Sequence, residues 1–216
     1  MSVIPYHQGL RLSDFEISAA LHHRTLNPGS AICPLCGIVN IAGHPEVCKK
    51  GTPWFVARHE QVKYAIKRAL ETVEGVRVAV EPHIANTNRR NDLLVTGSEA
   101  SGFSNHEYDV TVVSLATRDS VETVIPPQVL PTKPAEKGHA HIRKFLAMKA
   151  ADKRRRLPNG DIPFTPLVFT VGGMMDDNTA QCLKAWQHAV TPFVFSTLCQ
   201  QLSLILLKAK AKSFVL

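Results

Sequence analysis

The chain of 216 residues is long enough for one medium-sized domain with a small appendage and too short for two large domains. Hydrophobic residues make up 44% and charged residues 20%, which is typical of a folded protein and excludes global disorder. The 25 Lys and Arg residues outnumber the 18 Asp and Glu residues, and the resulting formal charge of +7 favours polyanions as partners.

Residues 1–30 are predicted to form an N-terminal helical arm. Ser13-Asp14-Phe15-Glu16 has the pattern of a capping box, in which the Ser13 hydroxyl accepts from the N–H of Glu16 and the Glu16 carboxylate accepts from the N–H of Ser13. A helix should follow to about Leu26, where the turn-forming residues 27–30 end it.

Residues 31–57 show little periodicity and contain four potential metal ligands. Cys33-x2-Cys36 is followed by His44-x3-Cys48, a spacing that suits a tetrahedral zinc ion bound by thiolates and an imidazole. Four protein ligands leave no open position, so we predict a structural zinc site, with buried free thiols beside a surface histidine as the alternative. Three clustered cysteines do not resemble the framework of a disulfide-bonded secreted protein, which favours an intracellular, reducing compartment.

Residues 58–175 are predicted to form the core domain. Apolar side chains recur at helical spacing over residues 58–74, and Gly75 stands where a left-handed cap would end that helix. Three short apolar runs bounded by turn residues then predict the strands of a meander, at 76–80, 92–96 and 108–115.

A proline-rich link over residues 126–134 separates the meander from the later elements. These are a helix ended by the turn at 157–160, a strand, and two further helices in a C-terminal unit, residues 176–216. Their expected positions are about 139–156, 164–171, 179–190 and 192–211. The element order predicts an α/β fold with a mixed sheet flanked by helices on both faces.

The most apolar stretch covers residues 193–207. It is interrupted by five polar side chains, at Ser196, Thr197, Gln200, Gln201 and Ser203. We therefore expect a buried helix and no membrane span there, and no basic-then-apolar signal segment opens the chain.

Positive charge is concentrated in residues 137–156, which contain eight Lys or Arg residues and one acid, Asp152. Such a segment is either a phosphate-facing surface or a solvated helix face. Arg58 and His59, expected at a helix start, are further candidates for phosphate contact, with packing against the zinc module or plain surface exposure as alternatives. The predicted nucleic-acid contacts are Arg58, His59, Arg143, Lys144, Arg154 and Arg155.

A second group of candidate residues is acidic. Asp92 and Asp109 lie on neighbouring predicted strands, where two carboxylates can converge on Mg²⁺ while leaving positions for water and a phosphate. Lys149 or Lys153 could then orient the attacking water, and we cannot choose between them from spacing alone. Glu81 could bind the metal directly, bind it through water, or face solvent.

These residues together resemble the C-terminal region of site-specific non-LTR retrotransposon polyproteins, where a CCHC zinc knuckle precedes a restriction-like endonuclease of the PD-(D/E)XK type. The similarity runs from about Ser13 to Gly173. The matching motifs are Cys33, Cys36, His44 and Cys48; Arg58-His59; Glu81-Pro82; Arg90-Asn91-Asp92; Asp109-Val110-Thr111-Val112; and Lys149 or Lys153.

The resemblance implies a restriction-endonuclease-like core with the order α-β-β-β-α-β. It implies Mg²⁺-dependent nicking of DNA by Asp92, Asp109 and a lysine, in a polyprotein that primes reverse transcription at the nick. The expected partners are DNA, with RNA as a second choice, and the rest of the polyprotein, and the expected location is the nucleus.

The chain departs from the family pattern at two positions. Asn91 stands where the family usually has proline, and Thr111 stands where a lysine would follow Asp109. The alternative is therefore a catalytically inactive zinc-knuckle module that binds nucleic acid. A zinc-stapled protein-interaction domain with no nucleic-acid role is a third possibility. Independently of these, Asp92 could simply cap or solvate a strand start, and Asp109 could be an exposed strand residue.

Overall fold

The structure is a computed structural model that describes residues 11–24, 32–33, 35–39, 44–83, 90–98, 101–116, 134–156 and 161–212. The helices are α1 (Asp14–Arg24), α2 (Thr52–Leu70), α4 (Pro134–Arg156), α5 (Asp177–Ala189) and α6 (Pro192–Lys212), and two 3-10 turns are η2 (His44–Glu46) and η3 (Lys49–Gly51). The strands are β1 (Arg77–Val80), β2 (Leu93–Thr96), β3 (His106–Val113) and β4 (Phe164–Thr170). The turns predicted at 27–30 and 157–160 lie outside the described residues, as does the proline-rich link except for Pro134.

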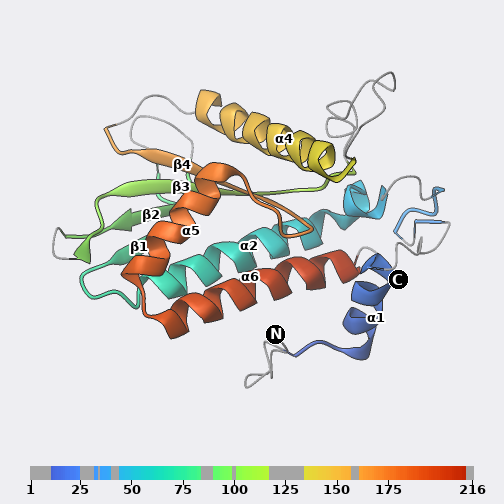
Figure 1. Cartoon of the computed structure of the whole chain (residues 1–216), viewed down its shortest axis with the longest axis horizontal. Helices are drawn as coiled ribbons and strands as arrows, with labels where there is room; N and C mark the ends of the chain where they lie inside the picture. Colours follow the sequence, from blue (N-terminus) through green and yellow to red (C-terminus); the bar gives the residue numbers. More distant parts are fainter. Residues whose placement is uncertain are drawn as a thin grey trace.

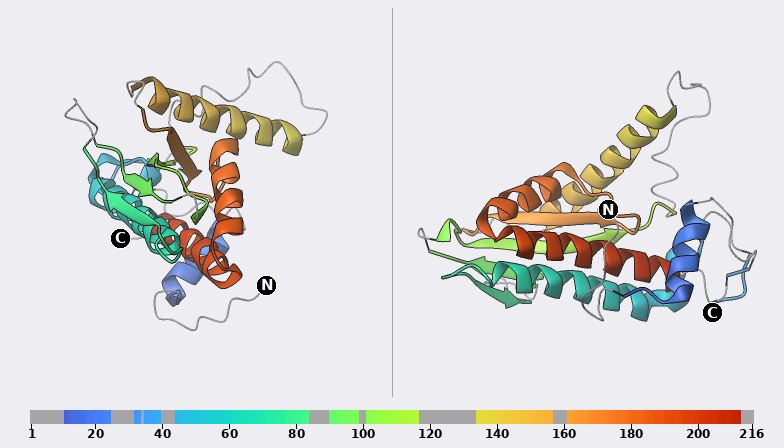
Figure 2. Two further views of the ribbon diagram at one scale, coloured as in Figure 1. Left: turned by 90° about the vertical axis from the view of Figure 1, so that its left-hand side faces the viewer. Right: turned by 60° about the horizontal axis from the view of Figure 1, so that its bottom comes forward.

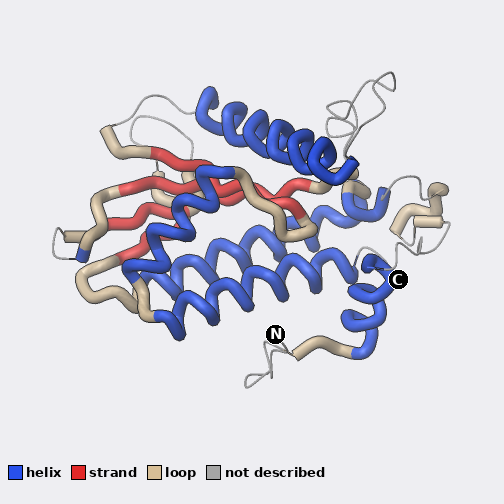
Figure 3. The backbone as a smooth tube through the Cα atoms, viewed as in Figure 1, coloured by secondary structure: helices blue, strands red, loops and turns tan. Residues whose placement is uncertain are grey.

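The four strands form one sheet in the order β1-β2-β3-β4 (Figure 3). β1, β2 and β3 are antiparallel neighbours, which confirms the predicted meander, while β3 and β4 are parallel and joined through α4. Parallel neighbours need a crossover connection, and α4 lies in it. The predicted mixed sheet is therefore confirmed.

Helices cover both faces of the sheet (Figures 1 and 2). On one face, α2, α5 and α6 contribute Ile66, Trp186 and Leu202 to the larger hydrophobic core. On the other face, α4 packs Phe145 and Leu146 around Val168 of β4. Alternation along a strand explains this arrangement, because successive side chains point to opposite faces.

Two helices begin earlier than the sequence predicted. α2 starts at Thr52 instead of residue 58, with Pro53 in its first turn, and α4 starts at Pro134 instead of about residue 139. Proline is well tolerated in the first turn of a helix, where its missing N–H has no helical partner. Arg58 and His59 therefore lie inside α2 and not at its start, which corrects that prediction.

Several other boundaries shift by a few residues. α2 ends at Leu70, and Gly75 takes its left-handed conformation, with φ of +76°, in the turn that follows. β3 begins at His106 instead of residue 108, because His106 still pairs with Val95 of β2. The capping box of α1 is confirmed, with Ser13 and Glu16 exchanging hydrogen bonds of 2.7 and 3.2 Å.

Among the described residues, α6 is the one helix long and apolar enough to span a membrane by length and composition, a test that core helices also pass. In this structure α6 lies along α2 and contacts α1. It buries one side, formed by Leu198, Leu202, Leu206 and Ala211. The predicted burial therefore holds for that side of the helix.

Candidate functional site

The Cys/His cluster near the N-terminus is the first candidate site. The ligand atoms of Cys33, Cys36, His44 and Cys48 all lie within 4.8 Å of one another, and Cys36 Sγ is 3.1 Å from His44 Nε2. Cys33 and Cys36 stand on a tight turn closed by Gly37, whose φ is +75°. Three thiolates and an imidazole this close together suit a tetrahedral ion, so the cluster could bind a metal such as zinc.

The cysteines of the cluster influence one another's protonation. Burial disfavours the Cys33 thiolate, but backbone N–H groups of Cys36 and Leu35 and the neighbouring thiols outweigh it, so the pKa of Cys33 is lowered. The N–H of Ile38 favours the Cys36 thiolate, but burial and the sulfurs of Cys33 and Cys48 outweigh it, so the pKa of Cys36 is raised. A divalent cation would relieve this competition, because metal binding requires and stabilises thiolates.

Glu46 attaches the cluster to the rest of the protein. It lies in η2, between His44 and Cys48, and its Oε2 accepts from the Ser114 hydroxyl at 2.6 Å. Its Oε1 lies 3.3 Å from Nζ of Lys210 in α6. The module therefore contacts the end of β3 and the end of α6 through one carboxylate.

Asp92 lies in the bend immediately before β2. Its Oδ2 accepts from the backbone N–H of Val110 at 2.6 Å, and the Nε2 atom of His59 lies 2.9 Å from the same oxygen and 3.0 Å from the carbonyl oxygen of Val110. The two oxygens next to Nε2, from the Asp92 carboxylate and the Val110 carbonyl, can only accept hydrogen bonds. Nε2 therefore carries a proton and donates to them. The hydrogen bond to Asp92 raises the pKa of His59.

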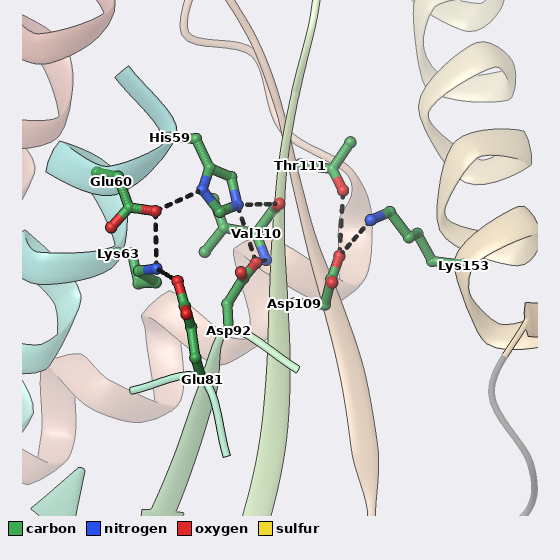
Figure 4. Close-up of polar contacts among 9 residues, drawn as sticks. All are labelled: His59, Glu60, Lys63, Glu81, Asp92, Asp109, Val110, Thr111 and Lys153. Carbon is green, nitrogen blue, oxygen red and sulfur yellow. Dashed lines mark hydrogen bonds and ion pairs between the residues drawn. The ribbon is translucent and has the colours of Figure 1, made fainter. Parts of the chain in front are cut away.

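Asp109 lies on β3 and is the second predicted metal ligand. Its Oδ2 is 2.7 Å from Nζ of Lys153 in α4 and 3.4 Å from the hydroxyl of Thr111. Figure 4 shows His59 reaching Asp92 from α2 while Lys153 reaches Asp109 from the opposite side. Burial raises the pKa of Asp109, Lys153 opposes that rise, and the charge of Asp92 adds to it. The two acids are therefore near enough to influence each other's charge.

The structure separates the two candidate lysines. Lys153 contacts Asp109, whereas Nζ of Lys149 lies 5.3 Å from the ring centroid of Phe145. Both lysines are on α4, four residues apart, but only Lys153 is placed beside a predicted metal ligand. Of the two lysines, Lys153 is the one positioned to act at Asp109.

Glu81 has an unusual backbone conformation and two cationic neighbours. Its φ of +52° is rare for a residue with a side chain. Its Oε1 accepts from Lys63 at 2.8 Å, its Oε2 lies 3.7 Å from Arg90, and the hydrogen bond from Lys63 lowers its pKa. Its N–H donates to the carbonyl of Asp92 at 2.9 Å, which keeps Glu81 beside the candidate site.

Lys63 was not predicted from the sequence. Its side chain is 0% exposed, and Nζ donates to Glu60 at 2.7 Å and to Glu81 at 2.8 Å. Burial acts to lower the pKa of Lys63, but the two carboxylates outweigh it and raise the pKa. The available signal was helical spacing, since Lys63 lies four residues after His59 and three before Ile66, on the buried side of α2.

The predicted nucleic-acid residues divide into two groups. Arg58 is buried, and its Nη2 donates to the carbonyl of Val112 at 3.2 Å. His59 is half-buried beside Asp92, so both residues pack against β3. The others are exposed on α4: Arg143, Lys144, Arg154 and Arg155.

Chemically, the arrangement offers two carboxylates with low exposure, Asp92 beside the His59 ring and Asp109 beside the Lys153 ammonium. The side chains of Asp92 and Asp109 are 14% and 15% exposed. Over the described parts of the chain, the Cys/His cluster is the one group of three or more ligand atoms close enough to share an ion. No model of a known protein family matches this chain, and no curated protein matches its sequence.

Proposed function

We propose that this chain is a metal-dependent DNA endonuclease domain that nicks one strand by phosphodiester hydrolysis. The observation that supports the proposal is that Asp92 accepts from the N–H of Val110 while the preceding residue, Asp109, pairs with Lys153 of α4, so both acids lie along one short stretch of β3. The order α2, β1, β2, β3, α4, β4 agrees with the α-β-β-β-α-β core that a restriction-like endonuclease requires. The retroelement resemblance in the motifs supports the same function.

In this proposal Asp92 and Asp109 hold Mg²⁺, which would polarise the phosphate and activate water. Lys153 orients the water and offsets charge on the phosphate, since it already lies 2.7 Å from Asp109. His59 holds the Asp92 carboxylate in place, and Glu81, tied to Lys63, assists at the edge of the site.

The proposed zinc ion at Cys33, Cys36, His44 and Cys48 has a structural role, and the exposed basic residues of α4 attract DNA phosphates. RNA is the second polyanion that such a surface would bind. We further propose that the chain is part of a retroelement-derived polyprotein, in which the nick would prime reverse transcription in the nucleus.

A catalytically inactive nucleic-acid-binding module is the competing function. It is favoured by the side chains that already occupy the two acids, His59 at Asp92 and Lys153 at Asp109, and by the departures at Asn91 and Thr111. Asn91 has a structural contact of its own, because its Nδ2 donates to Glu107 at 2.5 Å. Thr111 bonds to Asp109 but supplies no positive charge.

The test is incubation of the purified chain with supercoiled plasmid and Mg²⁺, with nicked circles as the measured product. We expect nicking by the wild type, none by Asp109→Asn, and a loss of about 10²-fold or more for Lys153→Gln. Lys184→Gln, on the exposed surface of α5, is the matched control and should nick like the wild type. DNA binding without nicking would contradict the endonuclease proposal and support the inactive nucleic-acid-binding module. Absence of DNA binding would contradict both proposals.

A further inference from the structure

A cavity of about 410 Å³ lies next to the candidate site. Its wall combines the loop between His44 and Cys48, the first turns of α2, the end of β3 and one side of α4. Thr111 and Lys153 belong to both the candidate site and the cavity wall. The two spaces are therefore adjacent, and the volume is in the range of sites that bind small groups.

Arg58, which lines this cavity, is a buried cation with incomplete hydrogen bonding. The residue is 8% exposed, and its Nη2 donates to Val112. Its Nε has no hydrogen-bond partner in the described part of the chain. Burial lowers the pKa of Arg58, yet a guanidinium remains charged in proteins. A buried, charged donor without an acceptor is costly, and an anion bound in the cavity is one partner that would offset this cost.

The charges around the cavity are predominantly positive. Arg58, Lys149, Lys153 and Arg156 face two acids, Glu46 and Asp152. Both acids have other cationic partners, since Glu46 lies 3.3 Å from Lys210 and Asp152 pairs with Arg155. Lys153 in turn pairs with Asp109, and the cavity wall still carries more cations than acids.

We propose that this cavity binds a backbone phosphate of a nucleic-acid strand, adjacent to the phosphate that the candidate catalytic site would hold. The choice of nucleic acid rests on the proposed function. Arg58 supplies a planar fork of donors that matches phosphate, and Thr111 supplies a hydroxyl. Arg156 is exposed, so the cavity meets solvent beside the last turn of α4.

The experiment measures binding of a fluorescent duplex oligonucleotide by anisotropy over a series of NaCl concentrations, with no added Mg²⁺ so that no cleavage occurs. Arg58→Gln should weaken binding about tenfold and reduce the slope of log affinity against log salt by about one. Arg58→Lys keeps the positive charge but loses the planar fork of donors. Its affinity for DNA should therefore lie between those of the wild type and Arg58→Gln. Arg68→Gln is the matched control, an exposed arginine on the same helix and outside the cavity, and should bind like the wild type.

Arg156→Gln tests the same cavity with a substitution that should not affect folding, because Arg156 is exposed and lies outside the core. It should also reduce the salt slope by about one. If neither Arg58→Gln nor Arg156→Gln changes affinity or slope, the inference is overturned even when the protein nicks plasmid. If both variants bind DNA with a reduced salt slope but the wild-type protein does not nick plasmid, the phosphate site is supported and the proposed endonuclease activity is contradicted.

A second measurement separates a strand phosphate from free phosphate. The melting temperature is recorded with inorganic phosphate and with sodium chloride at matched ionic strength. A stabilisation by inorganic phosphate that Arg58→Gln abolishes, together with unchanged DNA binding by that variant, would assign the cavity to a free anion and overturn the strand proposal. The proposal expects DNA binding and any phosphate stabilisation to fall together.

Discussion

Two single side chains, Asp92 and His59, complete the sheet just before β2 begins. β3 continues past Asp92, so the N–H and C=O of Val110 lose their strand partner and must be satisfied otherwise. The Asp92 carboxylate accepts from that N–H, and His59 Nε2 lies 3.0 Å from that carbonyl. Asp92 and His59 therefore have a structural role in addition to the proposed chemical one, and replacing either will also disturb the sheet.

Asp109 is the residue at which stability and the proposed chemistry should conflict. Its folded-state pKa is raised, chiefly by burial, so the folded state binds more protons than the unfolded state. Its contribution to stability is therefore fully present below the unfolded pKa near 3.8 and is lost as the pH rises through the folded pKa. We predict that Asp109→Asn raises the free energy of unfolding at pH 7 relative to wild type and that this gain shrinks in acid.

Urea unfolding of both proteins from about pH 3.5 to pH 7 measures the difference. Asp161→Asn, at an exposed position, is the control and should show no such trend. A wild-type protein more stable than Asp109→Asn at pH 7 would mean that the ion pair with Lys153 outweighs burial.

At the scale of elements, α5 protects the outer edge of β4. The N–H of Val168 donates to the Thr179 hydroxyl at 2.8 Å, and the carbonyl of Val168 accepts from Asp176 N at 3.2 Å. Asp176 in turn caps α5, accepting from the N–H groups of Asn178 and Thr179 and from the Thr179 hydroxyl. An edge strand otherwise presents unpaired groups, so this cap serves the sheet as well as the helix.

We predict that Asp176→Ala lowers the free energy of unfolding by about 1–3 kcal/mol, because it leaves buried donors of α5 without an acceptor. Asp177→Ala is the matched control, since its side chain is exposed one residue later, and should change stability by less than about 0.5 kcal/mol. Equal effects at the two positions, measured by chemical denaturation, would contradict the capping role.

At the scale of the whole molecule, the Cys/His module adjoins a domain that has its own core. Glu46 joins the module to Ser114 and Lys210, and the same loop forms one wall of the cavity. The two hydrophobic clusters lie elsewhere, among the sheet, α2, α4, α5 and α6. Loss of the metal should therefore unfold the module and open the cavity while the core survives.

We predict that a strong chelator lowers the zinc content from about one ion per chain to none and speeds amide exchange over residues 44–51, while residues 62–70 stay protected. Zinc content is measured by mass spectrometry, and exchange by hydrogen–deuterium labelling. Cys36→Ser should reproduce the effect, whereas Cys182→Ser, outside the cluster, should keep its metal. Protection that is lost equally in both regions would show that the module and the core unfold together.

Local patterns predicted the features that depend on residues close together in the chain. The capping box at Ser13, the four ligands from Cys33 to Cys48 and the order of helices and strands were all recognisable, because hydrogen bonding and ligand spacing there act over short separations. The predicted helix starts were too late, because apolar spacing became recognisable only from residue 58 in α2 and because Pro134 fits a first turn as well as a linker.

The sequence by itself determined that this protein has a mixed α/β fold with a Cys/His cluster near its N-terminus that could bind a metal, because periodicity and ligand spacing are properties of neighbouring residues. Only the tertiary structure decided that Lys153 and not Lys149 meets Asp109, that Lys63 and Arg58 are buried, and that a cationic cavity lies beside them. Those contacts join residues far apart in the chain, and their positions follow from how α2 and α4 pack on opposite faces of one sheet.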